Sequence, residues 1–333
     1  MKKTPMKTLF YMMLIMSTMM SITATSWLGV WMGLEINLLS FIPLISNQSM
    51  FNNSSIKYFI TQTLASIMLI TSFITLMMSL FNQHKEIIYM MMAMSILMKM
   101  GAAPMHFWFP EVMEFLKWKN CMLLMTWQKI APMIMMSYIN VNQLFMTIII
   151  IMSATVGAIL GLNQISLRLI LSYSSINHMG WMLASIQTSM TNWMLYFMIY
   201  SLLTMLISFS FKSNNINFIN EMFINKNNHK IDKLNSAIAF LSLGGMPPFI
   251  GFLPKWMLMQ ELMQTSMYFT SVTLIVSSTI TLYFYMKMFL SAGILSFKEN
   301  KWLKNNFFIK NKLLMLMNMI STLGLMLSPM ILK

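Results

Sequence analysis

Long apolar stretches separated by short polar segments make up almost the whole chain. Eleven of these stretches are about 18 residues or longer, the length with which a helix crosses a bilayer. They lie near residues 7–24, 27–45, 57–81, 87–108, 121–138, 141–162, 167–187, 190–211, 235–260, 266–292 and 313–331. Two hydrophilic loops, near 212–234 and 293–312, are too short for a soluble domain. The pattern predicts an all-α, polytopic membrane helix bundle that forms a single integral-membrane domain over residues 1–333.

The amino-acid composition is that of a membrane protein. Of 333 residues, 57% are hydrophobic and 9% are charged, whereas soluble domains carry about 25% charged residues. One cysteine, Cys121, excludes an internal disulfide and a cysteine-ligated iron–sulfur cluster, and no nucleotide-binding glycine motif occurs. We therefore expect no cofactor in this chain. The net charge of +14 does not indicate nucleic acid, because membrane topology explains basic loops.

Methionine is very frequent, with 46 residues against a single arginine. This bias fits an AT-rich gene read with a code in which AUA means Met, as in invertebrate mitochondria. The start of the chain, MKKTPMKTLFYMMLIM, is basic and then apolar, but the apolar run lacks an A-x-A-like cleavage site. We expect it to be retained as the first helix of a mitochondrial inner-membrane protein.

The distribution of cations tests the number of spans. Eleven spans place the termini on opposite sides, and sixteen of the 22 basic residues then fall on the N-terminal side. Two, Lys85 and Lys333, fall on the other side, and four lie inside spans. By the positive-inside rule, this asymmetry predicts an N-terminus on the matrix side and a C-terminus on the intermembrane-space side.

Three charged residues lie deep inside predicted spans. Glu35 is near the middle of the second span, Lys99 is central in the fourth, and Lys129 is in the middle of the fifth. A charge at the bilayer centre costs roughly 2.5–3.5 kcal/mol and usually faces a bundle interior or a water-filled path. Lys99 is too deep to snorkel easily. Glu35 can also be interpreted as a structural partner of one lysine.

Lys255 follows the segment LSLGGMPPFIGFLPKW, which is unsuited to a continuous helix. Proline lacks a backbone N–H and clashes with the preceding turn, so Gly244, Gly245, Pro247 and Pro248 predict a break in the ninth span. Polar backbone at membrane depth is tolerated only where protein or water lines it. We therefore interpret Lys255 as a functional residue.

A polar run surrounds His178 in the seventh span, RLILSYSSINHMGW. Histidine titrates near neutral pH and can pass a proton between its two nitrogens, which favours a proton relay. Alternatively, the hydroxyl groups of this run hold helices together by bonding across an interface. Elsewhere, Lys287 is interpreted as snorkelling to the basic side, and Glu111 and Glu114 as solvated loop charges.

The buried titratable groups form a set with one acid and several bases. Its members are Glu35, Lys99, Lys129, His178 and Lys255. The single negative charge of Glu35 cannot cancel the positive charges of three lysines. A purely structural ion pair would need only one of these lysines. A buried lysine can lose its proton under desolvation and neighbouring cations, and two such groups within reach titrate as a coupled pair. The set therefore favours a proton relay.

Five motifs are spread over nearly the whole chain. They are WLGVWMGLEINLLSFIPLI at 27–45, LMKMGAAPMHFWFPEV at 97–112, WQKIAP at 127–132, LILSYSSINHMGW at 169–181 and LSLGGMPPFIGFLPKW at 241–256. Together they resemble the NADH dehydrogenase subunit 2 family, the mitochondrially encoded membrane subunits of respiratory complex I, which is similar to Mrp-type cation/proton antiporter subunits. The resemblance implies two broken helices and a charged axis along the membrane midplane, in the eleven-helix form found in animals.

The resemblance also implies a role for each buried group. The family's buried glutamate falls on Glu35, the lysines of the two broken helices on Lys99 and Lys255, the central lysine on Lys129 and the histidine between them on His178. The chain would then translocate protons as a subunit of NADH:ubiquinone reductase, while other subunits bind NADH, FMN, the Fe–S clusters and ubiquinone. Its expected partners are other complex I membrane subunits, including neighbouring antiporter-like subunits, and membrane lipids.

Two other functions stay open at this point. A free-standing secondary cation/proton antiporter would have the same charged axis and broken helices, although the mitochondrial codon bias and the eleven spans argue against it. A non-pumping scaffold that links neighbouring subunits would tolerate neutralisation of the buried lysines without loss of coupled activity.

Overall fold

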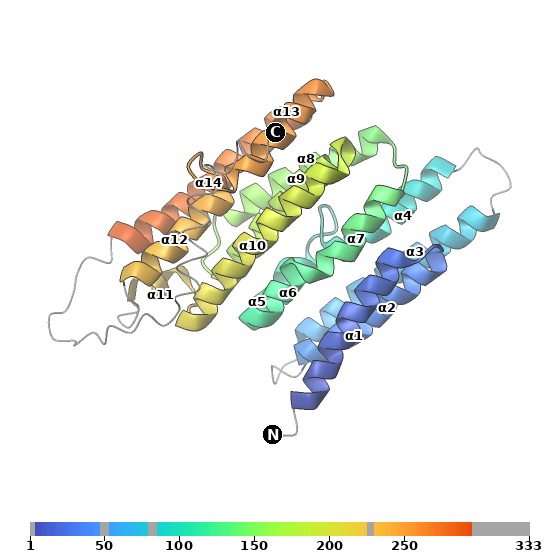
Figure 1. Cartoon of the computed structure of the whole chain (residues 1–333), viewed down its shortest axis with the longest axis horizontal. Helices are drawn as coiled ribbons and strands as arrows, with labels where there is room; N and C mark the ends of the chain where they lie inside the picture. The colour runs from blue at the N-terminus through green and yellow to red at the C-terminus, as the bar shows by residue number, and fades with distance from the viewer. Residues whose placement is uncertain (1–3, 47–52, 79–84, 225–229, 295–333) are drawn as a thin grey trace. The chain divides into compact units, whose positions relative to one another are not determined.

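The computed structural model describes residues 4–46, 53–78, 85–224 and 230–294. All regular elements in these ranges are helices (Figure 1), which confirms the all-α prediction for this part of the chain. They are α1 Thr4–Thr23, α2 Trp27–Ser46, α3 Asn53–Met78, α4 Lys85–Met100, α5 Trp108–Phe115, α6 Trp118–Met125, α7 Trp127–Tyr138, α8 Gln143–Gly161, α9 Leu167–Thr188, α10 Met190–Asn214, α11 Ile219–Ile224, α12 Lys230–Gly244, α13 Phe252–Gln264 and α14 Tyr268–Ile294.

Six described helices are long and apolar enough to cross a membrane, so the chain is a multi-pass membrane protein. Their spanning segments are Met6–Thr23, Trp27–Ser46, Ser54–Met78, Gln143–Gly161, Met190–Asn214 and Tyr268–Leu290. The predicted fifth and ninth spans are each divided between two shorter helices, and the predicted fourth, 87–108, is helical only as far as Met100, where α4 ends. The polar run lies on α9. The segment near 212–234 contains α11 and the start of α12. The predicted span at 313–331 lies outside the described residues, and the count of eleven stays a prediction.

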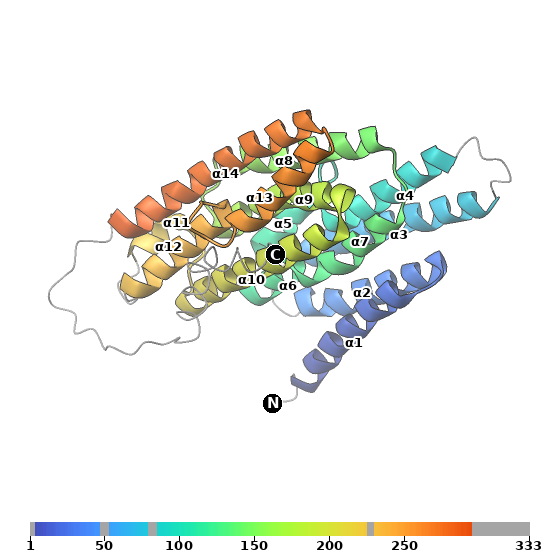
Figure 2. The same ribbon diagram turned by 45° about the horizontal axis from the view of Figure 1, so that its top comes forward.

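The chain divides into two compact units, and the border between Met152 and Ser153 falls within α8. In the first unit, α2 packs against α1 and α3, and α3 packs against α4, as Figures 1 and 2 show. In the second unit, α10 packs against α9 and α12, and α12 packs against α14. The single domain expected over 1–333 stays a prediction.

The interruptions between α4 and α5 and between α12 and α13 have the same backbone geometry at their start. Each begins with a glycine in the left-handed region, Gly101 with φ 75° and Gly245 with φ 78°, where a side chain would be strained. The residue after each glycine donates its N–H to a carbonyl five positions back, the bond of a Schellman motif. These bonds are Ala102 N to Leu97 O at 3.1 Å and Met246 N to Leu241 O at 3.3 Å.

Both interruptions also have the same spacing of glycine and proline. The pattern G-x-x-P-x-x-x-x-x-P occupies residues 101–110 and 245–254. The first proline cannot continue a helix. The second proline is the third residue of the following helix in both cases, where its missing N–H has no intrahelical partner to lose. Thus the local sequence ends the first helix at the residue before the glycine and begins the next helix at the same distance from it in both interruptions.

Hydroxyl side chains bond mainly within their own helices. Ser17, Ser72 and Ser208 each donate to the carbonyl three residues earlier, at 2.8–2.9 Å, which satisfies the hydroxyl in an apolar environment. The serines near His178 do the same; they are Ser172, Ser174 and Ser175. In this region Asn177 bonds between helices, because it accepts from Ser277 of α14 at 3.3 Å and donates to Thr281 at 3.4 Å.

Candidate functional site

The first unit contains three of the five expected site residues. Glu35 lies on α2, Lys99 in the last turn of α4 and Lys129 in the first turn of α7. Lys99 is 7% exposed and Lys129 is 2% exposed, so both lysines lie inside the protein. Glu35 interacts electrostatically with Lys99 and with the buried phenol of Tyr58. Its Oε1 is buried and has no hydrogen-bond partner among the described residues.

One cavity in this unit is lined by both Lys99 and Lys129. It offers ≈ 20 Å³ to the centres of water molecules, and roughly 10–15 Å³ is enough to hold one water. Its polar lining supplies the several hydrogen-bond partners that an internal water needs. The lining residues are Leu34, Asn37, Leu38, Tyr58, Gln62, Lys99, Met100, Trp108, Phe109, Leu124, Gln128, Lys129 and Pro132. The cavity can therefore place water between the two lysines.

Two amide side chains fix the helices around this cavity. Gln128 of α7 donates through Nε2 to Oδ1 of Asn37 on α2 at 2.9 Å. Gln62 of α3 donates to the carbonyl oxygen of Lys99 at 3.3 Å. The sequence interpretation did not include these amides, although Asn37 is two residues from Glu35 and Gln128 is adjacent to Lys129. Polar residues close to a buried charge were the signal that could have identified them.

Aromatic rings surround the cationic groups in both units. Lys129 Nζ lies 5.2 Å from the centroid of Phe109. In the second unit, Lys255 Nζ lies 5.5 Å from the ring centroid of Trp181 and donates to the carbonyl oxygen of Gly244 at 2.8 Å. An added Cβ on Gly245 would fall 3.0–3.2 Å from the Lys255 side chain, so the glycine leaves room for it. The cation–π attraction of such contacts is strongest where water is excluded.

His178 is buried on α9 and contacts two tyrosines of α10. Its Nδ1 lies 2.8 Å from the hydroxyl of Tyr196, and its ring centroid is 5.1 Å from that of Tyr200. The histidine is 5% exposed and Lys255 is 7% exposed, so these two expected site residues are both internal. The predicted transfer between Lys129 of the first unit and His178 of the second stays a prediction.

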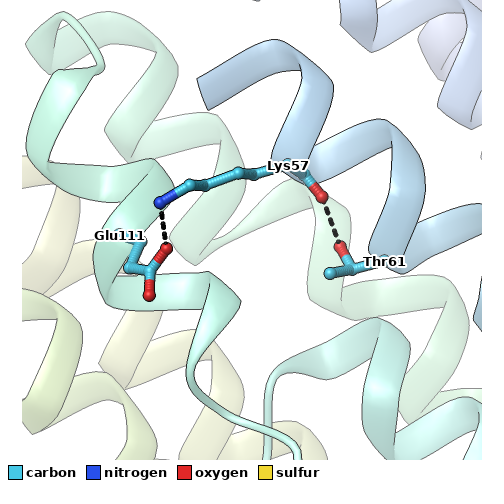
Figure 3. A network of polar contacts seen from close by, with 3 residues as sticks. All are labelled: Lys57, Thr61 and Glu111. Atoms are coloured by element: carbon cyan, nitrogen blue, oxygen red, sulfur yellow. Dashed lines mark hydrogen bonds and ion pairs between the residues drawn. The ribbon is translucent and has the colours of Figure 1, made fainter. Parts of the chain in front are cut away.

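A surface ion pair joins α3 and α5 in the first unit. Lys57 contacts Glu111, while the hydroxyl of Thr61 donates to the Lys57 carbonyl at 3.0 Å (Figure 3). The two charged side chains are 48% and 50% exposed. Glu111 is therefore solvated, but the interpretation of Glu111 and Glu114 as loop residues is wrong, because α5 includes both. Lys287 is exposed on α14, which is compatible with snorkelling.

The described residues contain no cluster of three or more histidine, cysteine or acidic side chains that could hold a metal ion. His106, in the interruption after α4, is buried, and its Nδ1 lies 3.2 Å from the carbonyl oxygen of Pro104. The buried titratable groups lie beside hydroxyl, amide and aromatic side chains, and Lys99 and Lys129 line one cavity. This arrangement suits proton transfer by way of water and hydroxyl groups.

Residues 24–281 match the family described as NADH:quinone oxidoreductase/Mrp antiporter, TM. A relative from Locusta migratoria named NADH-ubiquinone oxidoreductase chain 2 is 48% identical, over 96% of this chain and 95% of the relative. A relative of the same name from Anopheles gambiae is 44% identical, over 97% of each chain.

A chain of the respiratory complex I from Thermus thermophilus with bound aureothin has a similar fold. Its TM-score is 0.85 at 19% sequence identity, over 97% of this chain and 79% of that one. A chain of the Mrp complex from Dietzia sp. DQ12-45-1b gives a TM-score of 0.71 at 13% identity, over 85% of this chain and 59% of that one.

Proposed function

Because the chain belongs to the NADH:quinone oxidoreductase/Mrp antiporter membrane family, we propose that it is a proton-translocating membrane subunit of respiratory complex I. The observation that carries the proposal is the cavity between Lys99 and Lys129. Two buried lysines and a nearby carboxylate line or flank a space that can hold water in an otherwise apolar bundle. Intramembrane ionisable residues of this kind usually serve ion or proton pathways.

The proposed relay runs through Glu35, Lys99, Lys129, His178 and Lys255. While the Glu35 carboxylate is charged, its attraction holds a proton on Lys99. When that attraction is lost, the proton leaves Lys99 and passes by way of water in the cavity to Lys129. The amide pair of Asn37 and Gln128 keeps α2 and α7 in register around this step. His178 and Lys255 continue the relay in the second unit.

The proposal includes the membrane arrangement. We propose that α4–α5 and α12–α13 are the two broken helices and that the chain crosses the mitochondrial inner membrane eleven times, with its N-terminus on the matrix side. Redox chemistry then takes place in other subunits, which bind NADH, FMN, the Fe–S clusters and ubiquinone. Coupling reaches this chain through neighbouring antiporter-like subunits as an electrostatic change, and its exposed apolar helix faces contact lipid.

Replacement of Lys99 tests the relay. In complex I assembled with the Lys99→Met chain and reconstituted into liposomes, we expect fewer protons pumped per NADH oxidised. The matched control is Lys287→Met, which neutralises an exposed lysine on α14 and should leave this ratio unchanged. An unchanged ratio for Lys99→Met would refute the relay. If the complex kept full coupled activity, the scaffold function would be favoured.

An assembly test separates the proposal from the antiporter alternative. The chain should co-purify with a large NADH-oxidising complex from membranes. If it instead purified alone and exchanged cations for protons without NADH, it would be a free-standing secondary antiporter.

A further inference from the structure

Lys255 is held by groups that carry no opposite charge. Its Nζ contacts the carbonyl oxygen of Gly244 and the face of the Trp181 ring. No carboxylate among the described residues lies within ion-pair distance of Lys255. The Gly244 carbonyl and the indole ring of Trp181 are thus the electrostatic partners that the described residues give this lysine.

The same ring leads to His178. Trp181 stacks on Tyr196, with ring centroids 6.4 Å apart and planes inclined by 14°. The hydroxyl of Tyr196 lies 2.8 Å from His178 Nδ1. Trp181 and Tyr196 are 1% and 2% exposed, so water does not compete with these contacts. Lys255, Trp181, Tyr196 and His178 therefore form a continuous series of contacts within the second unit.

We infer that Trp181 and Tyr196 form an aromatic bridge that positions Lys255 and His178 for proton transfer. This inference rests on the proposed function, because the bridge matters only if these two groups carry protons. Trp181 and Tyr196 are positioning residues: Trp181 holds the Lys255 ammonium in place, and Tyr196 holds the His178 ring in place. Neither aromatic side chain needs to change its own protonation state.

The chemistry of indole suits the lysine end of the bridge. A ring face attracts the charged ammonium but interacts little with the neutral amine, so the contact favours the protonated lysine. Indole has one N–H donor and no acceptor, so it cannot take the proton that it helps to hold. A carboxylate at this place would attract the ammonium and also compete for its proton. Trp181 therefore stabilises the protonated lysine without being able to accept its proton.

The chemistry of phenol suits the histidine end. A tyrosine hydroxyl both donates and accepts. It can donate to the bare Nδ1 of neutral His178 and accept from the Nδ1–H of the charged ring. One side chain thus serves both protonation states without moving, and its ring keeps the stack on Trp181.

Substitutions at Trp181 separate an electrostatic role from packing. In complex I assembled with the variant chain, Trp181→Leu should lower the proton-pumping rate roughly 2- to 30-fold, the range that a cation–π contact spans. Trp181→Phe keeps a smaller aromatic face and should recover most of the rate. The matched control is Trp193, which is also buried and stacks on Phe197 at 5.8 Å. The Trp193→Phe and Trp193→Leu complexes should pump protons at the same rate.

A second measurement tests the histidine end. Tyr196→Phe keeps the stacked ring and removes the hydroxyl. Because the hydrogen bond with the charged imidazole ring is stronger than the bond with the neutral ring, the midpoint of the pH profile of pumping should move by roughly half a unit. Tyr283→Phe is the control, because the Tyr283 side chain is exposed on α14, away from the buried contacts of His178. Its profile should match that of the parent complex.

The outcomes distinguish the bridge from the relay. If the Trp181→Phe and Trp181→Leu complexes pump equally, or if Tyr196→Phe and Tyr283→Phe have the same pH profile, the aromatic bridge is wrong. Lys255→Met provides the independent check on the relay. If Lys255→Met pumps normally, the proposed relay fails and the bridge fails with it. If Lys255→Met lowers pumping while the aromatic variants do not, the bridge alone is refuted.

Discussion

Replacement of Gly251 by alanine should force α12 and α13 apart. Gly251 is the last residue of their interruption, and a Cβ added to it would meet the carbonyl oxygen of Ser242 at 1.8 Å. Such contacts essentially never fall below 3.0 Å, so the two segments must separate by at least 1.2 Å, the difference between these distances. The obstructing atom belongs to the backbone, so no side-chain rotation relieves the clash.

This displacement acts directly on Lys255. Its bond to the Gly244 carbonyl is 2.8 Å long, and a shift of 1.2 Å would lengthen it to at most about 4.0 Å, if the shift lies along the bond, which is beyond hydrogen-bond reach. Overpacking typically costs 1–3 kcal/mol, and a hydrogen bond to a charged group contributes about 1.5–3 kcal/mol. We therefore expect Gly251→Ala to destabilise the second unit by several kcal/mol and to impair pumping.

The assay measures protons pumped per NADH oxidised in liposomes, together with the thermal stability of the assembled complex. Gly29→Ala in α2 is the control, because its Cβ would meet a side-chain carbon of Ala24 at 3.1 Å, a contact that small adjustments relieve. The reasoning is refuted if Gly251→Ala is as stable as Gly29→Ala and pumps with the same ratio.

Two smaller predictions concern the first unit. A double-mutant cycle of Lys57→Met and Glu111→Gln, measured by thermal unfolding, should give a coupling of only about 0.2–1 kcal/mol, because both side chains are half exposed; a coupling above ~2 kcal/mol would contradict this. Asn37→Leu and Gln128→Leu should each destabilise by about 1–3 kcal/mol, because each leaves an amide at the cavity, buried for Asn37 and part-buried for Gln128, without its partner. The double variant should lose less free energy of unfolding than the two single variants lose together. Additive losses would show that the two amides act independently.

The positions of the long helices could be predicted from the sequence because each apolar run is close to bilayer length. The predicted second span at 27–45 corresponds to α2, Trp27–Ser46, and the predicted seventh at 167–187 to α9, Leu167–Thr188. The division of the predicted fifth span at Thr126 could not be predicted, because no glycine or proline marks that position. There the Thr126 hydroxyl bonds back to the Met122 carbonyl at 2.8 Å, and its backbone leaves ideal helical geometry.

The candidate site could be predicted only in part. Charged residues such as Lys99 stand out because they are expensive within an apolar span. The groups that surround them, such as Tyr58, Gln62 and Trp181, are common in membrane helices and become recognisable only when packing brings separate helices together. Glu111 shows the same limit, because its partner Lys57 is distant in sequence.

Because most hydroxyl groups bond to their own helices, many helix–helix contacts have no side-chain hydrogen bond between the two helices. Sliding one helix along another at such a contact breaks no side-chain hydrogen bond and meets resistance only from interlocked apolar groups. Amide side chains bond between helices instead: Asn177 joins α9 to α14, Gln62 joins α3 to α4, Gln128 joins α7 to α2, and Asn120 joins α6 to α2. Sliding between these helices would have to break these bonds, and two of these four amides line the cavity that Lys99 and Lys129 also line.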